Sequence, residues 1–218
     1  MAASVTILYL IRHGQVAKAR PRSYNGQSDV PLSALGAQQM ERLADWASSA
    51  GVTAVYCSDL QRTRSGADQV ARRCVATVTV SSSLREKHFG SWEGLTYEEA
   101  EQRFPTEWRA WLIDPSIARP PGGETYREVE DRVVPLVRGI VSDHLGQTVL
   151  ILAHGGVNRV LLCRALGLPL RQAFRIEQDY ACVNRIDCAA GDRWRVALLN
   201  SALPGDPLRP LPGSDETS

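Results

Sequence analysis

Short runs of apolar residues alternate with longer stretches of helical spacing along the chain. Six runs are short and rich in β-branched residues, which is typical of strands buried in a sheet. We expect these strands at Val5–Ile11, Val52–Ser58, Val75–Val80, Thr148–Ala153, Cys182–Asp187 and Arg193–Leu198. Because strands that alternate with helices form mostly parallel sheets covered on both faces, the pattern predicts an α/β fold. The expected architecture is a single-domain three-layer sandwich with a mostly parallel sheet.

Apolar residues three and four positions apart indicate helices between these strands. Ser33–Ala50 is the first, with Ser33 placed to cap its start and Gly51 to end it. Asp59 is expected to cap a second helix that runs through Val70. Two further helices are expected later in the chain, at Thr125–Leu145 and Val157–Leu166.

Residues 85–123 interrupt this alternation. They are rich in aromatic residues and broken by Gly and Pro, and we expect a short lid insertion with one or two helices around Tyr97–Leu112. No internal repeat or linker divides the chain. We therefore expect one domain over residues 1–202, followed by a disordered Pro-rich tail over residues 203–218.

The overall charge excludes some classes of partner. The chain has 25 Lys and Arg against 24 Asp and Glu, a net charge of +1. Nucleic acids and anionic membranes both require a concentrated positive field, so neither is an expected partner. Five cysteines without a CxxC pair suit reduced thiols, and no apolar run approaches the ~18 residues of a membrane span. We expect a soluble cytoplasmic protein. A monomer and a homodimer are both compatible with the sequence.

Two histidines occupy parallel settings in the pattern. His13 follows the first expected strand in Arg12-His13-Gly14, and His154 follows the strand TVLILA and precedes Gly155. Ligands of open α/β sheets bind beyond the carboxyl ends of the strands. Glycine leaves room for a ligand and frees backbone amide donors. The pattern therefore predicts that both imidazoles lie on one rim; the alternative is that each only satisfies a hydrogen bond at a strand end.

The inventory of side chains favours phosphoryl transfer. We find no metal-ligand spacing, no GxSxG turn, no cysteine in a reactive setting and no P-loop, and we expect no metal or other cofactor. A neutral imidazole can attack phosphorus. One arginine guanidinium can bind two phosphate oxygens at once. A second, protonated histidine can neutralise the charge on the phosphate oxygens. A carboxylic acid must protonate the leaving oxygen. Sequence chemistry alone does not choose this acid among Glu86, Glu93, Glu98 and Glu99.

Six motifs in order resemble those of one known family. They are residues 10–14 (LIRHG), 26–36 (GQSDVPLSALG), 57–65 (CSDLQRTRS), 84–94 (LREKHFGSWEG), 121–125 (PGGET) and 152–155 (LAHG). Together they resemble the histidine phosphatase superfamily, in its phosphoglycerate mutase-like branch. Each motif is modest evidence by itself, whereas the ordered set is specific and covers residues 5–165.

The resemblance implies a role for each residue that matches a motif. His13 is then the nucleophile, and Arg12, Arg62 and His154 form the phosphate pocket. Gly155 is expected to contribute its backbone amide to the same pocket.

Three further positions depend on the resemblance alone. It selects Glu86 as the proton donor and later as the base for water. It also places Asn25 and Gly26 at the phosphate, with Asn25 as a side-chain donor. Ala19 departs from the family, since many members carry an asparagine there that contacts phosphate.

The lid insertion bears on whether the protein is a phosphatase or a mutase. A phosphoglycerate mutase needs a long lid with adjacent arginines for the substrate carboxylate, whereas here a single arginine, Arg109, lies between Trp108 and Trp111. We therefore expect a phosphatase. The i, i+3 spacing of the tryptophans favours packing on the domain; the alternative, that they line the mouth, suits an aromatic or apolar leaving group.

The substrate is the least defined prediction. The compact lid and residues 179–184 (DYACVN) resemble bacterial phosphatases of the α-ribazole-5′-phosphate type, which act in cobalamin synthesis. The alternatives are a broad sugar-phosphate or phosphoglycerate phosphatase, a phosphoglycerate mutase and, least favoured, an inactive module that binds a phosphorylated ligand.

Overall fold

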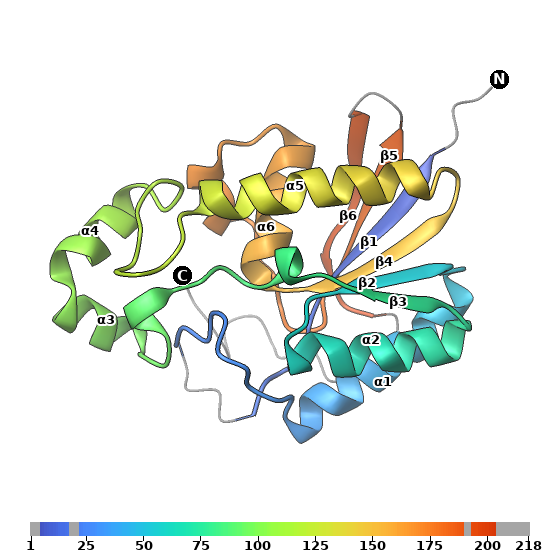
Figure 1. Ribbon diagram of the computed structural model, residues 1–218, viewed down its shortest axis with the longest axis horizontal. Helices are drawn as coiled ribbons and strands as arrows, with labels where there is room; N and C mark the ends of the chain where they lie inside the picture. The colour runs from blue at the N-terminus through green and yellow to red at the C-terminus, as the bar shows by residue number, and fades with distance from the viewer. Residues whose placement is uncertain (1–4, 18–21, 190–192, 204–218) are drawn as a thin grey trace.

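A computed structural model describes residues 5–17, 22–189 and 193–203 (Figure 1). The strands are β1 (Thr6–Arg12), β2 (Ala54–Cys57), β3 (Thr77–Val80), β4 (Thr148–Ala153), β5 (Val183–Ala189) and β6 (Arg193–Ser201). The helices are α1 (Ala34–Ser49), α2 (Gln61–Cys74), α3 (Tyr97–Arg103), α4 (Pro105–Ile113), α5 (Tyr126–Asp143) and α6 (Gly155–Leu166). Short 3₁₀ turns lie at η1 (Ser82–Leu84), η2 (Gly90–Trp92) and η3 (Leu170–Arg175).

The strands form one six-stranded sheet in the order β3-β2-β4-β1-β5-β6. Neighbours among β3, β2, β4 and β1 are parallel, and β5 and β6 complete the sheet in antiparallel pairings. All six expected strands are present; Thr148–Ala153 matches at both ends, and no end of the others is shifted by more than three residues. The α/β prediction and the mostly parallel sheet are confirmed.

Alternating side chains give the sheet a core on each face. In β1, Leu8 and Leu10 pack into a cluster with α5 and α6, whereas Ile11 packs into a second cluster with α1 and α2. Figure 1 shows α5 along one side of the sheet and α1 and α2 along the other. These are the three layers expected from the sequence.

The starts of α1 and α2 are capped in different ways. Ser33 caps α1 as predicted, because its side chain accepts a backbone N–H of the first turn. The prediction for Asp59 is wrong, because its carboxylate binds the Arg85 guanidinium at 2.7 and 2.6 Å. The backbone N–H of Gln61, at the start of α2, instead donates to Asp29 Oδ1 at 2.8 Å. The capping group thus comes from a loop about 30 residues earlier, which a local capping pattern does not reveal.

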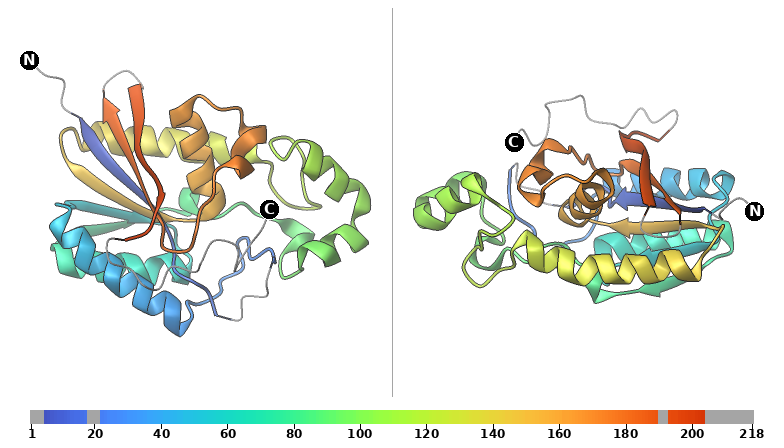
Figure 2. Two further views of the ribbon diagram at one scale, coloured as in Figure 1. Left: turned by 180° about the vertical axis from the view of Figure 1, so that it is seen from behind. Right: turned by 90° about the horizontal axis from the view of Figure 1, so that it is seen from above.

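The lid insertion folds as two short helices, α3 and α4, which lie together beyond one end of the sheet (Figure 2). Trp108 and Trp111 are only 8% and 5% exposed, and both pack against Trp92 at ring separations of 5.6 and 5.8 Å. The packing interpretation of the two tryptophans is therefore confirmed. They belong to the core under the lid insertion and do not line its mouth.

The ends of the sequence are described only in part. Leu203, the first residue of the expected tail, is buried in the cluster with α1 and α2. Residues 204–218 and Ala19 lie outside the described residues. Of the helices in the described ranges, none has the length and apolar character needed to cross a membrane.

Candidate active site

His13 and His154 lie side by side at the carboxyl edge of the sheet. Strands β1 and β4 are parallel with Arg12 opposite Ala153, so both histidines follow their strands at the same level. The backbone N–H of His13 donates to the Ala153 carbonyl at 3.1 Å. The two rings are 5.2 Å apart at an angle of 63°, and both side chains are buried. This is the shared rim expected from the strand pattern.

A backbone carbonyl orients the His13 ring. Nδ1 lies 2.8 Å from the Gly14 carbonyl oxygen, which can only accept, so Nδ1 carries the hydrogen and Nε2 keeps its lone pair. Burial lowers the pKa of His13 well below the usual 6.5, and the charges of Arg62 and Arg12 lower it further. The imidazole is therefore neutral near pH 7, which is the form that attacks an electrophile.

His154 is held through its other nitrogen. Nε2 lies 2.8 Å from Ser58 Oγ, which is in turn hydrogen-bonded to Thr63 at 2.7 Å. Nδ1 of His154 is buried and has no hydrogen-bond partner among the described residues. Burial, then the charges of Arg62, His13 and Arg12, keep the pKa of His154 low. A bound dianion would oppose these effects and favour the protonated ring.

Two arginines surround the histidines with positive charge. Arg62, on the first turn of α2, is 1% exposed, and its Nη groups donate to the carbonyls of Ser28 and Gly26 at 2.7 and 2.6 Å. Its Nε has no partner, and among the described residues no carboxylate pairs with it. Arg12 lies over the Tyr180 ring at 4.1 Å. A buried arginine that pairs with no described carboxylate, such as Arg62, is typical of an anion site.

Glu86 reaches the start of α6 next to His154. One carboxylate oxygen accepts the Lys87 backbone N–H at 2.8 Å, and the other accepts the Gly156 backbone N–H at 3.0 Å. A Cβ on Gly156 would lie 2.3 Å from Glu86 Oε1, so the approach requires glycine at this position. The carboxylate is thus fixed by backbone donors at the start of α6, two residues after His154.

The other three candidate carboxylates have different tasks. Glu93 accepts the backbone N–H groups of the 27–28 turn at 2.9 Å each and so holds the loop that binds Arg62. Glu98 forms an exposed ion pair, and Glu99 completes the capping box at the start of α3. Of the four carboxylates, Glu86 is the one bonded to α6.

Gly26 and Asn25 are the two loop residues to which the resemblance assigns phosphate binding, and the structure places them differently. Gly26 binds Arg62 through its carbonyl, and its positive φ of 50° and the close Glu93 carboxylate both require glycine. Asn25 is half-buried in the same turn, and its side chain forms no hydrogen bond with the described residues. Its contact with phosphate stays a prediction.

Gly155 is the first residue of α6, whose amino end carries partial positive charge. Arg12 and Arg159 are the side chains nearest to a Cβ built on Gly155, at 3.5 and 3.4 Å. Gly155 therefore lies beside Arg12, and the binding of phosphate by its amide stays a prediction.

Sequence reasoning missed the residues that support this site. Ser58 holds His154, and the Tyr180 ring lies 5.7 Å from that of His13 as well as under Arg12. Gln178 and Asn184 form a buried amide pair at 2.9 Å, and the Gln178 carbonyl accepts from Arg12. The one signal for this group was the stretch 179–184 (DYACVN), which contains Tyr180 and ends at Asn184 in β5.

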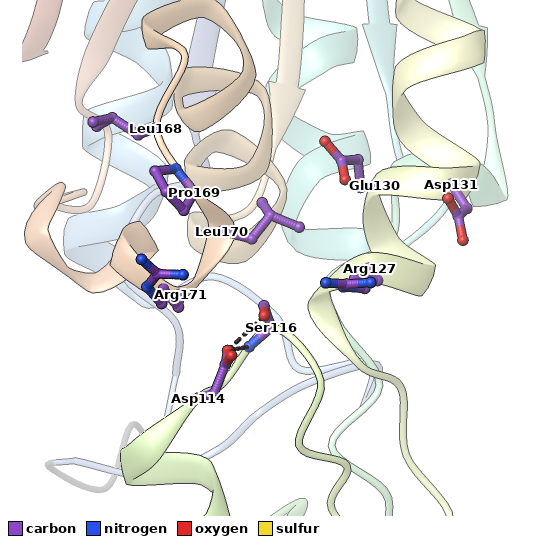
Figure 3. A pocket seen from close by; sticks show the side chains of 9 residues that line it. All are labelled: Asp114, Ser116, Arg127, Glu130, Asp131, Leu168, Pro169, Leu170 and Arg171. Carbon is purple, nitrogen blue, oxygen red and sulfur yellow. Dashed lines mark hydrogen bonds between the residues drawn. The ribbon is translucent and has the colours of Figure 1, made fainter.

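A separate pocket of about 510 Å³ lies between the start of α5 and η3 (Figure 3). Arg127, Asp131 and Arg171 line it, and Ser116 donates to Asp114 at its edge. It shares no residue with the histidine site. Across the described ranges, His, Cys, Asp and Glu side chains form no group of three or more that could hold a metal ion.

Comparison with known proteins gives relatives over most of the chain. The "Bifunctional protein Rv2228c" of Mycobacterium tuberculosis is 36% identical over 196 residues, which cover 89% of this chain and 54% of that protein. The chain thus spans about half the length of this relative. The "Probable phosphoglycerate mutase GpmB" of Salmonella paratyphi B is 34% identical over 186 residues, 83% of this chain and 84% of that protein.

Solved structures of phosphatases have the same fold. A mycobacterial glucosyl-3-phosphoglycerate phosphatase, Rv2419c, aligns with a TM-score of 0.82 and 29% identity over 91% of this chain and all of its own (100%). The α-ribazole phosphatase from Shigella flexneri aligns with a TM-score of 0.80 and 28% identity over 89% of this chain and 96% of its own. Residues 8–202 match the family described as histidine phosphatase superfamily (branch 1). The protein is a member of this superfamily, which comprises phosphatases and mutases.

Proposed function

We propose that the protein is a phosphomonoester hydrolase that works through a phosphohistidine on His13. The observation that carries the proposal is the orientation of this ring. The Gly14 carbonyl binds Nδ1–H at 2.8 Å and leaves Nε2 as the nucleophile, while Arg12, Arg62 and His154 surround it. A neutral nucleophile inside a cationic pocket suits attack on a phosphate dianion.

The first step transfers the phosphoryl group to the enzyme. His13 Nε2 forms a bond to phosphorus as the ester P–O bond breaks, and Glu86 gives its proton to the leaving alkoxide. Arg12, Arg62 and the amino end of α6 hold the remaining phosphate oxygens. Protonated His154 neutralises part of the charge that these oxygens carry.

The second step returns the enzyme to its starting state. Glu86, now a carboxylate, takes a proton from a water molecule, whose oxygen attacks phosphorus. The P–N bond to His13 breaks, inorganic phosphate leaves, and Glu86 is again protonated. One carboxyl group serves as acid and then as base, and its two backbone hydrogen bonds keep it in place for both steps.

The lid insertion supports hydrolysis rather than isomerisation. Residues 85–123 contain no adjacent pair of arginines for a substrate carboxylate, and the tryptophans on either side of Arg109 are buried in the core. A phosphatase needs only that water reach the phosphohistidine. The resemblance to GpmB is the observation in favour of mutase activity, which the assay below measures.

For the substrate we propose a small phosphorylated metabolite, with α-ribazole 5′-phosphate as the first candidate. The likeness to the Shigella phosphatase supports this choice. The comparable likeness to the glucosyl-3-phosphoglycerate phosphatase supports a phosphorylated sugar acid as the second. All five cysteines are unpaired, in keeping with the proposed cytoplasmic location.

The test is an assay of EDTA-treated protein with p-nitrophenyl phosphate, α-ribazole 5′-phosphate, glucosyl-3-phosphoglycerate and 3-phosphoglycerate. We expect hydrolysis that His13→Ala abolishes, with a phosphoprotein trapped by rapid acid quench in the wild type. The ranking of kcat/KM then identifies the substrate class. Isomerised 3-phosphoglycerate would favour the mutase, and binding of phosphate without any turnover would favour the inactive module.

A further inference from the structure

The loop between η3 and β5, residues 177–182, contacts Arg12 of the candidate site from two directions. The Gln178 carbonyl accepts a hydrogen bond from Arg12 Nη1 at 2.5 Å. Two residues later in the loop, the centre of the Tyr180 ring lies 4.1 Å from the guanidinium carbon of Arg12 and 5.7 Å from the centre of the His13 ring. The carbonyl binds one edge of the guanidinium, and the aromatic ring covers one of its faces.

The Gln178 side chain is buried and hydrogen-bonded at both ends of its amide. It is only 3% exposed. Its Oε1 accepts from Asn158 Nδ2 at 3.0 Å and from Asn184 Nδ2 at 2.9 Å. Its Nε2 donates to Asn184 Oδ1 at 2.9 Å and to the Glu177 carbonyl at 2.8 Å. A buried amide whose donors and acceptor are all used is held in one position. The side chain therefore fixes the backbone that carries the Gln178 carbonyl.

The same network returns to the strand that carries Arg12. Asn184 Nδ2 also donates to the Leu10 carbonyl at 3.0 Å, and Leu10 precedes Arg12 by two positions in β1. Asn184 belongs to β5, and Asn158 belongs to α6. Contacts from β1, β5 and α6 thus meet at Gln178. They define the place of the Arg12 guanidinium relative to its own strand.

The backbone around the network has two angles that residues other than glycine rarely adopt. The angle φ is +57° at Ala181 and +44° at Asn200. The Ala181 N–H donates to the His13 carbonyl at 3.1 Å. Asn200 donates its own N–H to Asn184 at 2.8 Å and binds Asp179 at 2.8 and 3.0 Å. Such angles persist where the surrounding contacts determine them, and they are enriched at functional sites. The contacts of this loop are thus maintained against a conformational cost.

We propose that Gln178 is a positioning residue for Arg12: its side-chain amide holds its own carbonyl against the guanidinium and so orients Arg12 for the phosphate. The inference rests on the proposed function, in which Arg12 binds phosphate oxygens. A mobile arginine loses side-chain freedom when it binds an anion, and this loss weakens binding. An arginine that the protein has already ordered does not lose that freedom again when the substrate arrives. Gln178 therefore acts through Arg12 and does not contact the substrate.

The test removes this support in two ways. Gln178→Met keeps the length of the side chain and removes its amide. Asn158→Leu keeps the branched shape and removes one hydrogen bond to Gln178. Since Asn158 Oδ1 is buried without a hydrogen-bond partner in the described part of the chain, this second variant disturbs folding less. Thr6→Val is the matched control, because it removes a buried hydroxyl that binds two carbonyls at the opposite end of β1. Each variant is also made together with Arg12→Met.

The first readout is the Kd of inorganic phosphate from titration calorimetry, measured together with kcat/KM for p-nitrophenyl phosphate. A hydrogen bond to a charged group is worth about tenfold or more, so Gln178→Met should weaken both quantities about tenfold. Asn158→Leu should weaken them about two- to threefold, and Thr6→Val should leave both unchanged. In the Arg12→Met background neither variant should have a further effect, because the residue through which it acts is gone. Equal effects in both backgrounds would show a general loss of structure and overturn the proposal.

The second readout needs neither a ligand nor turnover, and it separates this proposal from the proposed function. Contacts that hold a guanidinium slow its rotation, which ¹⁵N NMR of the arginine Nη atoms detects. We expect slow rotation for Arg12 in the wild type and in Thr6→Val, and faster rotation in Gln178→Met and Asn158→Leu. This result supports the positioning role even if no substrate is hydrolysed. Fast rotation in the wild type, or unchanged rotation in the two variants, overturns it even if the protein is an active phosphatase.

Discussion

At the scale of single residues, glycines and carbonyls do as much as charged groups to define the site. The Gly14 carbonyl fixes the His13 ring, and the bare Cα of Gly156 admits the Glu86 carboxylate. Backbone groups of this kind have little freedom to move, so the side chains of the candidate site are placed before a ligand arrives. Such preorganisation is a main source of catalytic power in polar sites.

Gly156→Ala should lower activity by displacing the Glu86 carboxyl group. The new Cβ would lie 2.3 Å from Glu86 Oε1 and would displace the carboxyl group. Because general acids contribute about 10²–10⁴ to rates, we expect kcat/KM for an alkyl phosphate to fall about 100-fold, and less with p-nitrophenyl phosphate.

Gly139→Ala is the matched control for this variant. Gly139 is an exposed position of α5 with nothing within 4 Å of an added Cβ. Its replacement should stabilise the protein by about 0.5–1 kcal/mol and leave kcat/KM unchanged. Full activity of Gly156→Ala would show that Glu86 is not the acid.

The two buried histidines should make stability depend on pH. The pKa of each is lower in the folded state than the usual 6.5, so the unfolded chain binds protons first as the pH falls. Stability is therefore highest above pH 6.5 and declines below it, by at most about 1.4 kcal/mol per pH unit and histidine.

Urea unfolding at pH 7.5 and 5.5 measures this decline. The double variant with His13→Asn and His154→Asn should lose about 2–3 kcal/mol less than the wild type over the same interval. An equal loss in both proteins would place the acid sensitivity in other groups.

At the scale of elements, α2 carries Arg62 into the site and depends on a distant cap. Asp29 accepts the backbone N–H of Gln61, the residue before Arg62. Asp29→Ala should destabilise the protein by about 1 kcal/mol in urea unfolding and raise KM for p-nitrophenyl phosphate several-fold. Asp59→Ala is the control, since its exposed ion pair with Arg85 is worth about 0–1 kcal/mol. If Asp59→Ala destabilised the protein more than Asp29→Ala, the result would favour Asp59 as the cap of α2, as the sequence suggested.

This element also shows how far sequence reasoning extends. The apolar runs of β1 and β4 were enough to predict both buried strands and the histidines that follow them, because the pattern is local. The cap from Asp29 and the hydroxyl of Ser58 on His154 are contacts between distant segments, and no local pattern contains them. Glu86 lies between these cases, since only its resemblance to a known motif distinguished it from neighbouring carboxylates.

At the scale of the whole molecule, the empty site lowers the stability of the folded protein, and a bound anion should raise it. Buried positive charge around Arg62 opposes folding, and an anion that neutralises it should shift the equilibrium toward the folded state. Inorganic phosphate at about 100 times its Kd should stabilise the wild type by roughly 2.7 kcal/mol in thermal unfolding. Phosphate should stabilise Arg62→Met much less than the wild type. Sodium chloride at the same ionic strength should not stabilise the wild type. A similar gain in Arg62→Met would place the anion elsewhere.

The position of β1 in the sheet has a consequence for synthesis on the ribosome. β1 is made before β4 and β5 and pairs with both, although their residues follow more than 130 positions later. His13 therefore leaves the ribosome long before the strand that carries its partner imidazole. During that interval the apolar face of β1 has no native neighbour, and long-range pairing of this kind is slow. A nascent chain that stalls before β4 exposes an unpaired apolar strand, which makes it a natural client for chaperones.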